Sequence, residues 1–116
     1  MTPTNYKFVT APDFERNFAR LFKKYRSLKQ DLAELKKELL ENPELGDDLG
    51  DNTRKVRMAI ASKNKGKRGG ARIITYHLFI DRNNSKIYFL TIYDKGEQDS
   101  ISEKEIRKLK TESGLI

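Results

Sequence analysis

The side chains of this 116-residue chain that could do chemistry are mostly basic, and they are concentrated in its middle. Between Asn52 and Ile80 there is no Asp or Glu, whereas the segments on either side carry acids and bases in nearly equal number, so the net charge of +7 originates here. An acid-free basic stretch bounded by glycine-containing turns is typical of a site for a polyanion, and the alternative is a solvated, disordered basic loop. Its cations are Arg54, Lys55, Arg57, Lys63, Lys65, Lys67, Arg68 and Arg72.

Strand periodicity sorts these cations into two groups. Alternate side chains of a strand face opposite ways, so Lys55 and Arg57 share one face and Val56, Met58 and Ile60 share the other. The following run, SKNKGKRGG, has the Gly and Asn content of a loop, and Arg72 opens a second strand rich in β-branched and aromatic residues. Lys55, Arg57 and Arg72 are therefore predicted to lie within reach of one phosphate group, with the loop cations following a nucleic-acid backbone around it.

A set of Lys, Arg and Tyr side chains can cleave RNA. The 2′-hydroxyl of RNA supplies the nucleophile, so the protein has mainly to orient it and to stabilise negative charge on the phosphorane. Tyr76, Tyr88 and Tyr93 accompany the basic residues and could stack on a splayed base or pass a proton. Packing in the sheet is the favoured interpretation for Tyr88 and an equal one for Tyr93. His77, the only histidine, is predicted to be a packed or surface residue rather than a general base.

Other catalytic classes lack the residues they need. The chain has no cysteine and one histidine, which argues against a disulfide framework, thiol chemistry and histidine-rich metal sites. The run from Gly66 to Gly70 lacks the spacing and the following helix of a phosphate-binding loop. We therefore expect no metal and no cofactor. Neither an apolar run of roughly 18 residues nor a signal-peptide core is present, so the expected location is the cytoplasm.

The N-terminal half is predicted to form a short strand and two helices. Residues 5–10 alternate as in a strand, and over residues 13–25 Phe, Leu and Tyr recur every three or four positions, as on one face of a helix. A second helix is expected to begin near Ser27, with Gln30 completing a capping box, and to stop at the Asn-Pro pair after its leucines. The acidic, glycine-containing stretch over 44–52 is expected to be a loop.

The C-terminal part is predicted to add a strand and a helix. The strand over 86–93 is apolar on both faces, which places it in the middle of a sheet. Ser102 and Glu105 form a capping box for a helix over 103–111, whose thin apolar content predicts that it packs at an edge or is loosely held. The whole chain, residues 1–116, is expected to be one domain of α+β class with the order β-α-α-β-β-β-α.

Four motifs give the chain a family resemblance: ENPELGD, RKVRMA, SKNKGKRGGARIITY and IYFLTIYDKGE. In this order they resemble the RelE/HigB superfamily of bacterial toxins, most closely its HigB-like branch, over residues 5–110. The resemblance implies a RelE-like, microbial-ribonuclease-like domain with a mainly antiparallel sheet and two N-terminal helices packed on one face. It also implies a ribosome-dependent endoribonuclease that cleaves mRNA without a cofactor. Such a toxin belongs to a type II toxin–antitoxin pair and is held inactive by an antitoxin that often bears a helix-turn-helix domain.

The resemblance also implies roles for individual positions. Arg72 matches the arginine that stabilises the scissile phosphate, and Lys55 and Arg57 match a pair of cations assigned to proton transfer or charge stabilisation. Tyr93 and Lys95 fall where the family places further active-site groups. The expected catalytic residues are Lys55, Arg57, Arg72 and Tyr93, and the expected RNA-binding residues are Lys63, Lys65, Lys67, Arg68 and Lys95.

Two departures from RelE proper leave the general acid and base unassigned. Gly96 stands where RelE has an arginine, and Ser102 stands where it has an aromatic residue. A ParE-like toxin that acts on gyrase and a non-catalytic RNA-binding or ribosome-binding module therefore remain alternatives. The basic sheet face favours RNA over a gyrase target.

Overall fold

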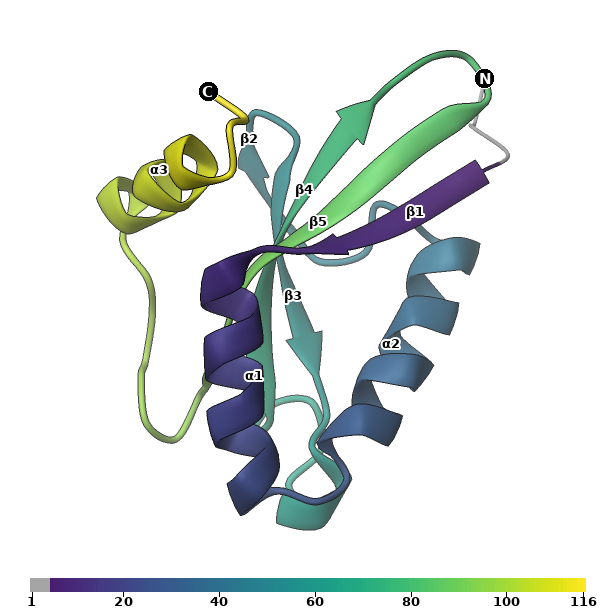
Figure 1. Ribbon diagram of the computed structural model, residues 1–116. Coiled ribbons are helices and arrows are strands. Elements are labelled where there is room, and N and C mark those ends of the chain that lie inside the picture. The colour runs from purple at the N-terminus through teal and green to yellow at the C-terminus, as the bar shows by residue number, and fades with distance from the viewer. Residues whose placement is uncertain (1–4) are drawn as a thin grey trace.

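The structure is a computed structural model that describes residues 5–116, and these residues form a five-stranded sheet with three α-helices (Figure 1). The strand order across the sheet is β1-β5-β4-β3-β2, with β1 parallel to β5 and every other neighbouring pair antiparallel. The elements are β1 (Asn5–Thr10), α1 (Pro12–Lys24), α2 (Leu28–Glu41), β2 (Asp47–Gly50), β3 (Thr53–Met58), the 3₁₀ turn η1 (Ala61–Lys63), β4 (Ala71–Phe79), β5 (Asn84–Asp94) and α3 (Glu103–Glu112). The predicted α+β class, the mainly antiparallel sheet and the interior position of the last strand are confirmed.

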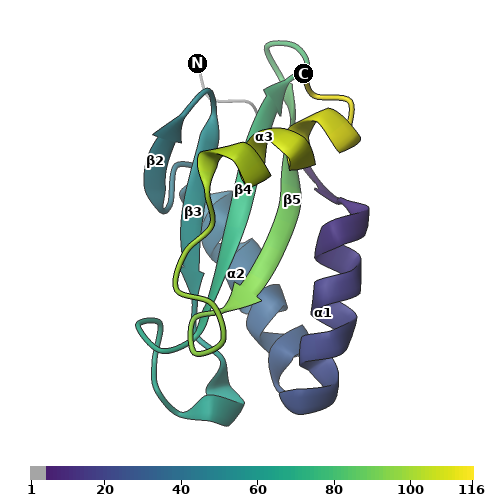
Figure 2. The ribbon, with the colours of Figure 1, turned by 90° about the vertical axis from the view of Figure 1, so that its left-hand side faces the viewer.

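Helices cover both faces of the sheet. α1 and α2 lie on one face and α3 lies on the other, as the two views in Figures 1 and 2 show. The main core lies under α1 and α2, where Phe14, Leu21 and the leucines of α2 meet Ile73 and Ile92 of the sheet. Burial of each such side chain stabilises the fold by roughly 1.5–3 kcal/mol, so this layer holds the strands in register. The predicted placement of the two N-terminal helices on one face is confirmed.

The junction between α1 and α2 differs from its prediction. The leucines of α2 lie on its buried face as expected, but the capping box does not form. Ser27 already has helical backbone angles (φ −76°, ψ −7°), because the connection from α1 is short. Its hydroxyl donates to Asp31 (2.7 Å) and accepts from the backbone N–H of Ser62 (2.9 Å), while Gln30 donates to Glu34 (3.1 Å). The predicted cap is therefore wrong. The Ser27 hydroxyl instead connects the start of α2 to Ser62 in the loop after β3.

The stretch over 44–52 that was predicted as a loop contains the edge strand β2. Its residues Asp47–Gly50 pair with β3, and a two-residue turn at Asp51 and Asn52 joins the two strands. Both turn residues have positive φ (50° and 59°), which Asp and Asn tolerate and which is typical of type I′ hairpins. The order is therefore β-α-α-β-β-β-β-α. Asp and Gly are poor strand formers, so pairing with β3 rather than local preference makes this segment extended.

α3 is more firmly placed than its thin apolar content predicts. It lies over β4 and β5, where Ile106 and Leu109 pack against fully buried residues of these strands, so the prediction of an edge position or loose attachment is wrong. The Ser102 half of the predicted capping box is confirmed, since Ser102 Oγ accepts a hydrogen bond from the backbone N–H of Glu105 at 3.1 Å. No helix in the described part of the chain, α3 included, is long and apolar enough to cross a membrane.

Candidate active site

The strand register brings the predicted catalytic side chains together. Arg57 of β3 lies opposite Arg72 of β4, and Arg72 lies opposite Tyr93 of β5. Directly paired residues point to the same face of a sheet, which here is the face that carries α3. Lys55, two residues before Arg57, shares that face. We call Lys55, Arg57, Arg72 and Tyr93 the basic row.

Arg72 is held in place by the loop that precedes it. Its side chain is only 5% exposed. The guanidinium donates from Nη1 to the carbonyl oxygens of Lys67 and Ala71 (3.0 and 3.1 Å) and from Nη2 to that of Arg68 (3.0 Å). Burial, and then the neighbouring Arg57, lower the pKa of Arg72, but a guanidinium remains charged in proteins. Arg72 is thus an oriented cation that uses three of its five N–H groups in these bonds.

Tyr93 is buried beside Arg72 with an unsatisfied hydroxyl. The residue is 4% exposed, and its Oη has no hydrogen-bond partner among residues 5–116. Buried polar atoms without a partner are rare in folded proteins, so this one requires an explanation. Burial raises the pKa of Tyr93 and outweighs the opposing effect of the Arg72 cation. The phenol is therefore neutral at physiological pH, where it can donate a proton or a hydrogen bond.

A carboxylate that sequence reasoning missed, that of Asp99, lies beside the row. Lys95 Nζ forms an ion pair with this carboxylate and also donates to the Asp99 carbonyl oxygen at 2.9 Å. The hydrogen bond from Lys95, followed by the charges of Lys95 and Lys55, lowers the pKa of Asp99. Asp99 in turn contributes to the raised pKa of Tyr93. The only signal in the sequence was the four-residue spacing from Lys95, which indicates a contact only within a helix.

Lys63, which was predicted to bind RNA, is turned away from solvent. Its side chain is 11% exposed, and its Nζ lies 2.7 Å from a carboxylate oxygen of Asp94, whose side chain is 1% exposed. The Tyr25 hydroxyl also donates to this carboxylate (2.6 Å), and Lys63 Nζ lies 5.6 Å from the Tyr25 ring centroid. To reach a phosphate, Lys63 would have to leave a buried ion pair, which is costly. The geometry therefore leaves Lys63 unsuited to the contact predicted for it.

The rest of the loop between β3 and β4 keeps its cations at the surface. Lys65, Lys67 and Arg68 are exposed, and Lys67 pairs with Glu38 of α2 at 2.9 Å in a contact that solvent weakens. The loop begins in η1, whose Ser62 exchanges two hydrogen bonds with the residue before α2 (2.9 and 3.0 Å). We call this segment between β3 and β4, residues 59–70, the anchored loop. It has exposed cations but is fixed to the helices, in contrast to the disordered loop that was the alternative interpretation of the sequence.

The remaining candidates of the sequence lie away from the row. His77 lies opposite Ile87, a residue of the core beneath α1 and α2, and burial lowers the pKa of His77. We call the buried residues Ile74, Leu90, Ile106 and Leu109 the α3 cluster. Tyr88 and Tyr76 pack against it, and the ring centroid of Tyr76 lies 5.3 Å from Lys110 Nζ. Tyr88 is thus a packed residue, as predicted, and His77 takes the packed one of the two positions predicted for it.

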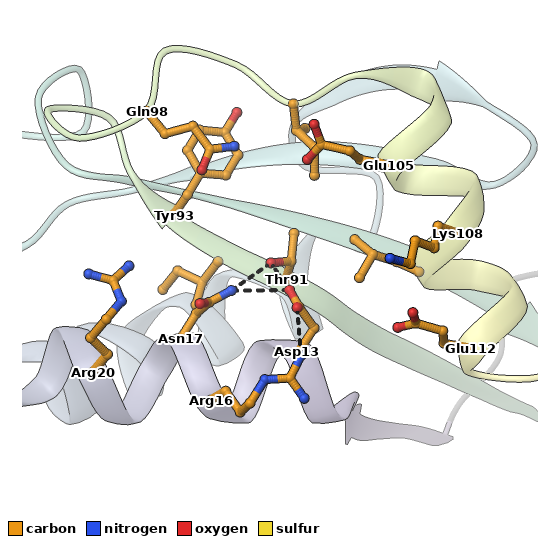
Figure 3. Close-up of a pocket in the computed structure, with 13 residues that line it drawn as sticks. Asp13, Arg16, Asn17, Arg20, Thr91, Tyr93, Gln98, Glu105, Lys108 and Glu112 are labelled. Carbon is orange, nitrogen blue, oxygen red and sulfur yellow. Dashed lines mark hydrogen bonds and ion pairs between the residues drawn. The ribbon is translucent and has the colours of Figure 1, made fainter.

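A pocket of about 320 Å³ opens beside the row, between α1 and α3 (Figure 3). Tyr93 and Gln98 line it from the end of β5 and the turn that follows. On the α1 side, the Asp13 carboxylate accepts hydrogen bonds from Thr91 Oγ1 (2.6 Å) and Asn17 Nδ2 (3.1 Å), drawn as dashed lines in Figure 3. The pocket therefore presents both acidic and basic side chains next to Tyr93. The row, by contrast, contains basic side chains and no acid.

The row offers fixed positive charge and a neutral phenol. Cations on one face can bind a phosphate and stabilise it as its charge rises in a transition state. A phenol at the edge of such a group can give a proton to a leaving oxygen. Within residues 5–116, no three His, Cys, Asp or Glu side chains are grouped so that they could hold a metal ion.

Most of the chain is similar to a known protein family. Residues 14–115 match the family model described as the RelE toxin of the RelE / RelB toxin-antitoxin system. The match runs from α1 to the residues after α3, and it includes the whole basic row and the anchored loop.

Proposed function

The chain belongs to the family of RelE toxins of RelE/RelB toxin–antitoxin systems, and we propose that it is a ribosome-dependent endoribonuclease that cleaves mRNA and thereby inhibits translation. A fold by itself does not establish an activity, so the site has to support the proposal. The observation that supports it is the basic row, in which three cations and a neutral phenol share one face of the sheet.

RNA cleavage requires little from the protein beyond charge and a proton. The 2′-oxygen attacks the adjacent phosphorus, a new P–O bond forms, and the bond to the 5′-oxygen of the next nucleotide breaks. The 2′-hydroxyl loses its proton to water, and the leaving 5′-oxygen gains one from Tyr93, which then recovers a proton from water. In this proposal Arg57 and Arg72 stabilise the charge on the phosphorane, Lys55 adds a third positive charge, and Tyr93 protonates the 5′-oxygen.

The weak basicity of the site is the reason for invoking the ribosome. Asp99, the carboxylate beside the row, has a lowered pKa and is therefore a poor acceptor for the 2′-proton. His77 lies on the other face of the sheet. Substrate positioning must then supply much of the rate, and positioning can lower a barrier by roughly 7–11 kcal/mol. A ribosome that holds mRNA in its A site provides such positioning, whereas free RNA does not.

The low exposure of Arg72 and Tyr93 also favours dependence on a large partner. Figure 2 shows that the segment between β5 and α3 crosses in front of the sheet on the side of the row. The ion pair of Glu97 with Arg20 (3.2 Å) joins this segment to α1, and the pair of Lys95 with Asp99 lies within it. Exposed pairs of this kind are weak, so a polyanion that binds their cations can displace the segment and reach the row.

The test is cleavage of mRNA by the purified protein with and without ribosomes. We expect cuts within the A-site codon of programmed ribosomes and little cleavage of the same RNA when it is free. Rapid cleavage of free RNA would contradict the dependence on ribosomes, and intact mRNA on programmed ribosomes would contradict the nuclease. Expression of the chain alone in bacteria should arrest growth and translation, and normal growth at verified soluble expression would contradict the translational block.

The partner that we propose is a cognate antitoxin of the helix-turn-helix type, which keeps the toxin inactive. Within the family we propose a place in the HigB-like branch, on the strength of the motifs SKNKGKRGGARIITY and IYFLTIYDKGE. The neighbouring reading frame tests both points, because a short gene for a small helix-turn-helix protein is expected beside this one. The proposed place of action is the cytoplasm, where programmed ribosomes are found.

One observation favours a second candidate function, a non-catalytic module that binds RNA or ribosomes. Arg72 already donates three hydrogen bonds to its own loop, so it could serve the structure alone while the exposed cations bind RNA. Saturable ribosome binding with intact A-site mRNA would establish this alternative. Growth arrest with intact mRNA and inhibited gyrase would instead indicate a ParE-like toxin.

A further inference from the structure

A buried ion pair lies directly beside the basic row. It joins Lys63 of the anchored loop to Asp94 at the end of β5, with 2.7 Å between Nζ and the carboxylate. We propose that Lys63 and Asp94 form a positioning pair that holds the loop around Arg72 and the strand end at Tyr93 in the geometry required for cleavage. The inference rests on the proposed ribosome-dependent cleavage, and it gives Lys63 a role other than RNA contact.

Asp94 is bound from three sides. Its carboxylate accepts hydrogen bonds from Lys63 Nζ (2.7 Å), from the Tyr25 hydroxyl (2.6 Å) and from the backbone N–H of Gly96 (2.9 Å). Burial by itself raises the pKa of Asp94, but these three bonds outweigh burial and hold the pKa below its usual range. The carboxylate is therefore ionised and fixed, and loss of its lysine would leave a charge buried without its counter-charge.

The pair is adjacent to both residues at the centre of the row. Asp94 follows Tyr93 in β5 and lies opposite Ala71, the residue before Arg72. The backbone N–H that follows Asp94 donates to the carbonyl that precedes Ala71, at 3.0 Å. The Asp94 carboxylate is thus attached where the loop and the strand end meet. A shift of this point would move Arg72 and Tyr93 together.

The other end of the pair starts from a fixed backbone position. Ser62 and Ser27 exchange two hydrogen bonds (2.9 and 3.0 Å), and the Asp31 carboxylate accepts from the backbone N–H of Ala61 at 3.2 Å. These contacts attach η1 to the start of α2. Lys63 is the last residue of η1. Its ion pair with Asp94 therefore connects α2 to the end of β5, so that each fixes the position of the other.

A second ion pair of the same loop provides a natural comparison. Lys67 and Glu38 lie at a similar distance, 2.9 Å, but both side chains are exposed. Water and salt screen such a pair, and either partner can leave it at little cost. Asp94 and Glu38 are therefore a matched set, since each is the acid partner of a loop lysine and only the first is buried.

The test compares Asp94→Asn with Glu38→Gln, since each substitution removes one negative charge and nearly keeps the side-chain shape. Single-turnover cleavage on saturating programmed ribosomes gives the rate constant, and ribosome binding at several salt concentrations gives the affinity. Asp94→Asn and Lys63→Met should each lower the rate constant by roughly 10- to 100-fold, because a misplacement of about 1 Å can cost about that much. Binding and its salt dependence should stay unchanged. Glu38→Gln should cleave like the wild type, and Lys63→Arg, which keeps the charge, should recover part of the rate.

Two further measurements separate positioning from other roles. Because the two residues act as one unit, the double variant of Lys63→Met with Asp94→Asn should lose no more rate than the worse single variant. Hydrogen exchange at the backbone N–H groups of Lys95 and Gly96 should be faster in Asp94→Asn and Lys63→Met than in Glu38→Gln. Exchange does not depend on activity, so it reports the order of the strand end directly.

The outcomes distinguish this inference from the proposed function. An unchanged rate constant in folded Asp94→Asn would overturn the inference, as would weaker binding with a smaller salt dependence in Lys63→Met, which is the signature of a phosphate contact. Should Asp94→Asn fail to fold, the Met and Arg variants of Lys63 carry the same test. If the wild type cleaved no mRNA, the proposed function would fall, and exchange at Lys95 and Gly96 would still decide whether the pair orders the strand end.

Discussion

Two lysines of the anchored loop and two arginines of the basic row show opposite ways in which the protein holds positive charge. In the loop, Lys63 and Lys67 are each paired with an acid from a distant element. In the row, Arg57 faces Arg72 across neighbouring strands, and its charge helps to lower the pKa of Arg72. Neutralised cations hold a structure together, whereas neighbouring cations repel each other until an anion binds. Uncompensated charge, rather than the number of basic residues, therefore indicates where a phosphate binds.

The largest effect is expected from removing the centre of the row. Arg72→Ala should lower cleavage on saturating ribosomes by roughly 10²–10³-fold, the range for the loss of one transition-state charge partner, and should leave ribosome binding nearly intact. The substitution also deprives three loop carbonyls of a donor, so circular dichroism must verify folding, and Arg72→Lys serves as the charge-preserving control. An equal loss of binding and cleavage, or wild-type cleavage, would remove Arg72 from the catalytic group while RNA binding could stand.

The second largest effect is expected from Tyr93→Phe, which removes a single oxygen atom from the row. The cleavage rate should fall by roughly 10²-fold, the lower end of the contribution of a positioned proton donor. The free energy of unfolding should stay the same or rise, since the buried Oη has no partner to lose among the described residues. Urea denaturation and single-turnover cleavage measure the two quantities, with Tyr88→Phe as the control from the α3 cluster. Full activity combined with lower stability would show that the hydroxyl is structural.

Low pH should reduce the free energy of unfolding because it protonates Asp94. The pKa of Asp94 is lower in the folded protein than in the unfolded chain, so its contribution to stability is fully present above the unfolded value of about 3.9 and is lost as the pH falls through the folded value. Urea denaturation between about pH 6 and pH 2 should therefore show a steeper loss of stability in the wild type than in Asp94→Asn. Parallel curves for the two proteins would mean that the buried ion pair contributes nothing to stability.

The smallest effect is expected from the exposed loop cations. Lys65→Ala should weaken ribosome binding a few-fold and reduce the slope of log affinity against log salt concentration by roughly 0.7–0.9, which corresponds to one phosphate contact. Its free energy of unfolding should change by less than about 0.5 kcal/mol. Lys104→Ala, an exposed cation at the start of α3, should leave the slope unchanged. Equal slope changes in both variants would mean that binding depends on total charge and not on the loop.

Most elements were predictable because their signals are local. A strand was expected through Val56, Met58 and Ile60 and is observed as Thr53–Met58, and the leucine spacing of α2 predicted its buried face. β2 was missed because its Asp and Gly residues favour strands only when a neighbouring strand offers backbone partners. The cap of α2 was mispredicted because the competing partner of the Ser27 hydroxyl, Ser62, lies 35 residues along the chain.

By itself the sequence determined which side chains share a face of the sheet, because alternation in a strand follows from the covalent geometry of consecutive residues. Lys55 and Arg57 lie on one face for that reason. Only the tertiary structure decided which cations a ligand can reach: Lys63 meets its acid across 31 residues and Lys67 meets its own across 29. Burial and pairing depend on distances through space, which a charge count along the chain does not contain. Two lysines from a stretch without acids in the sequence therefore meet acids in the folded protein, whereas Arg57 and Arg72 of the same stretch face each other.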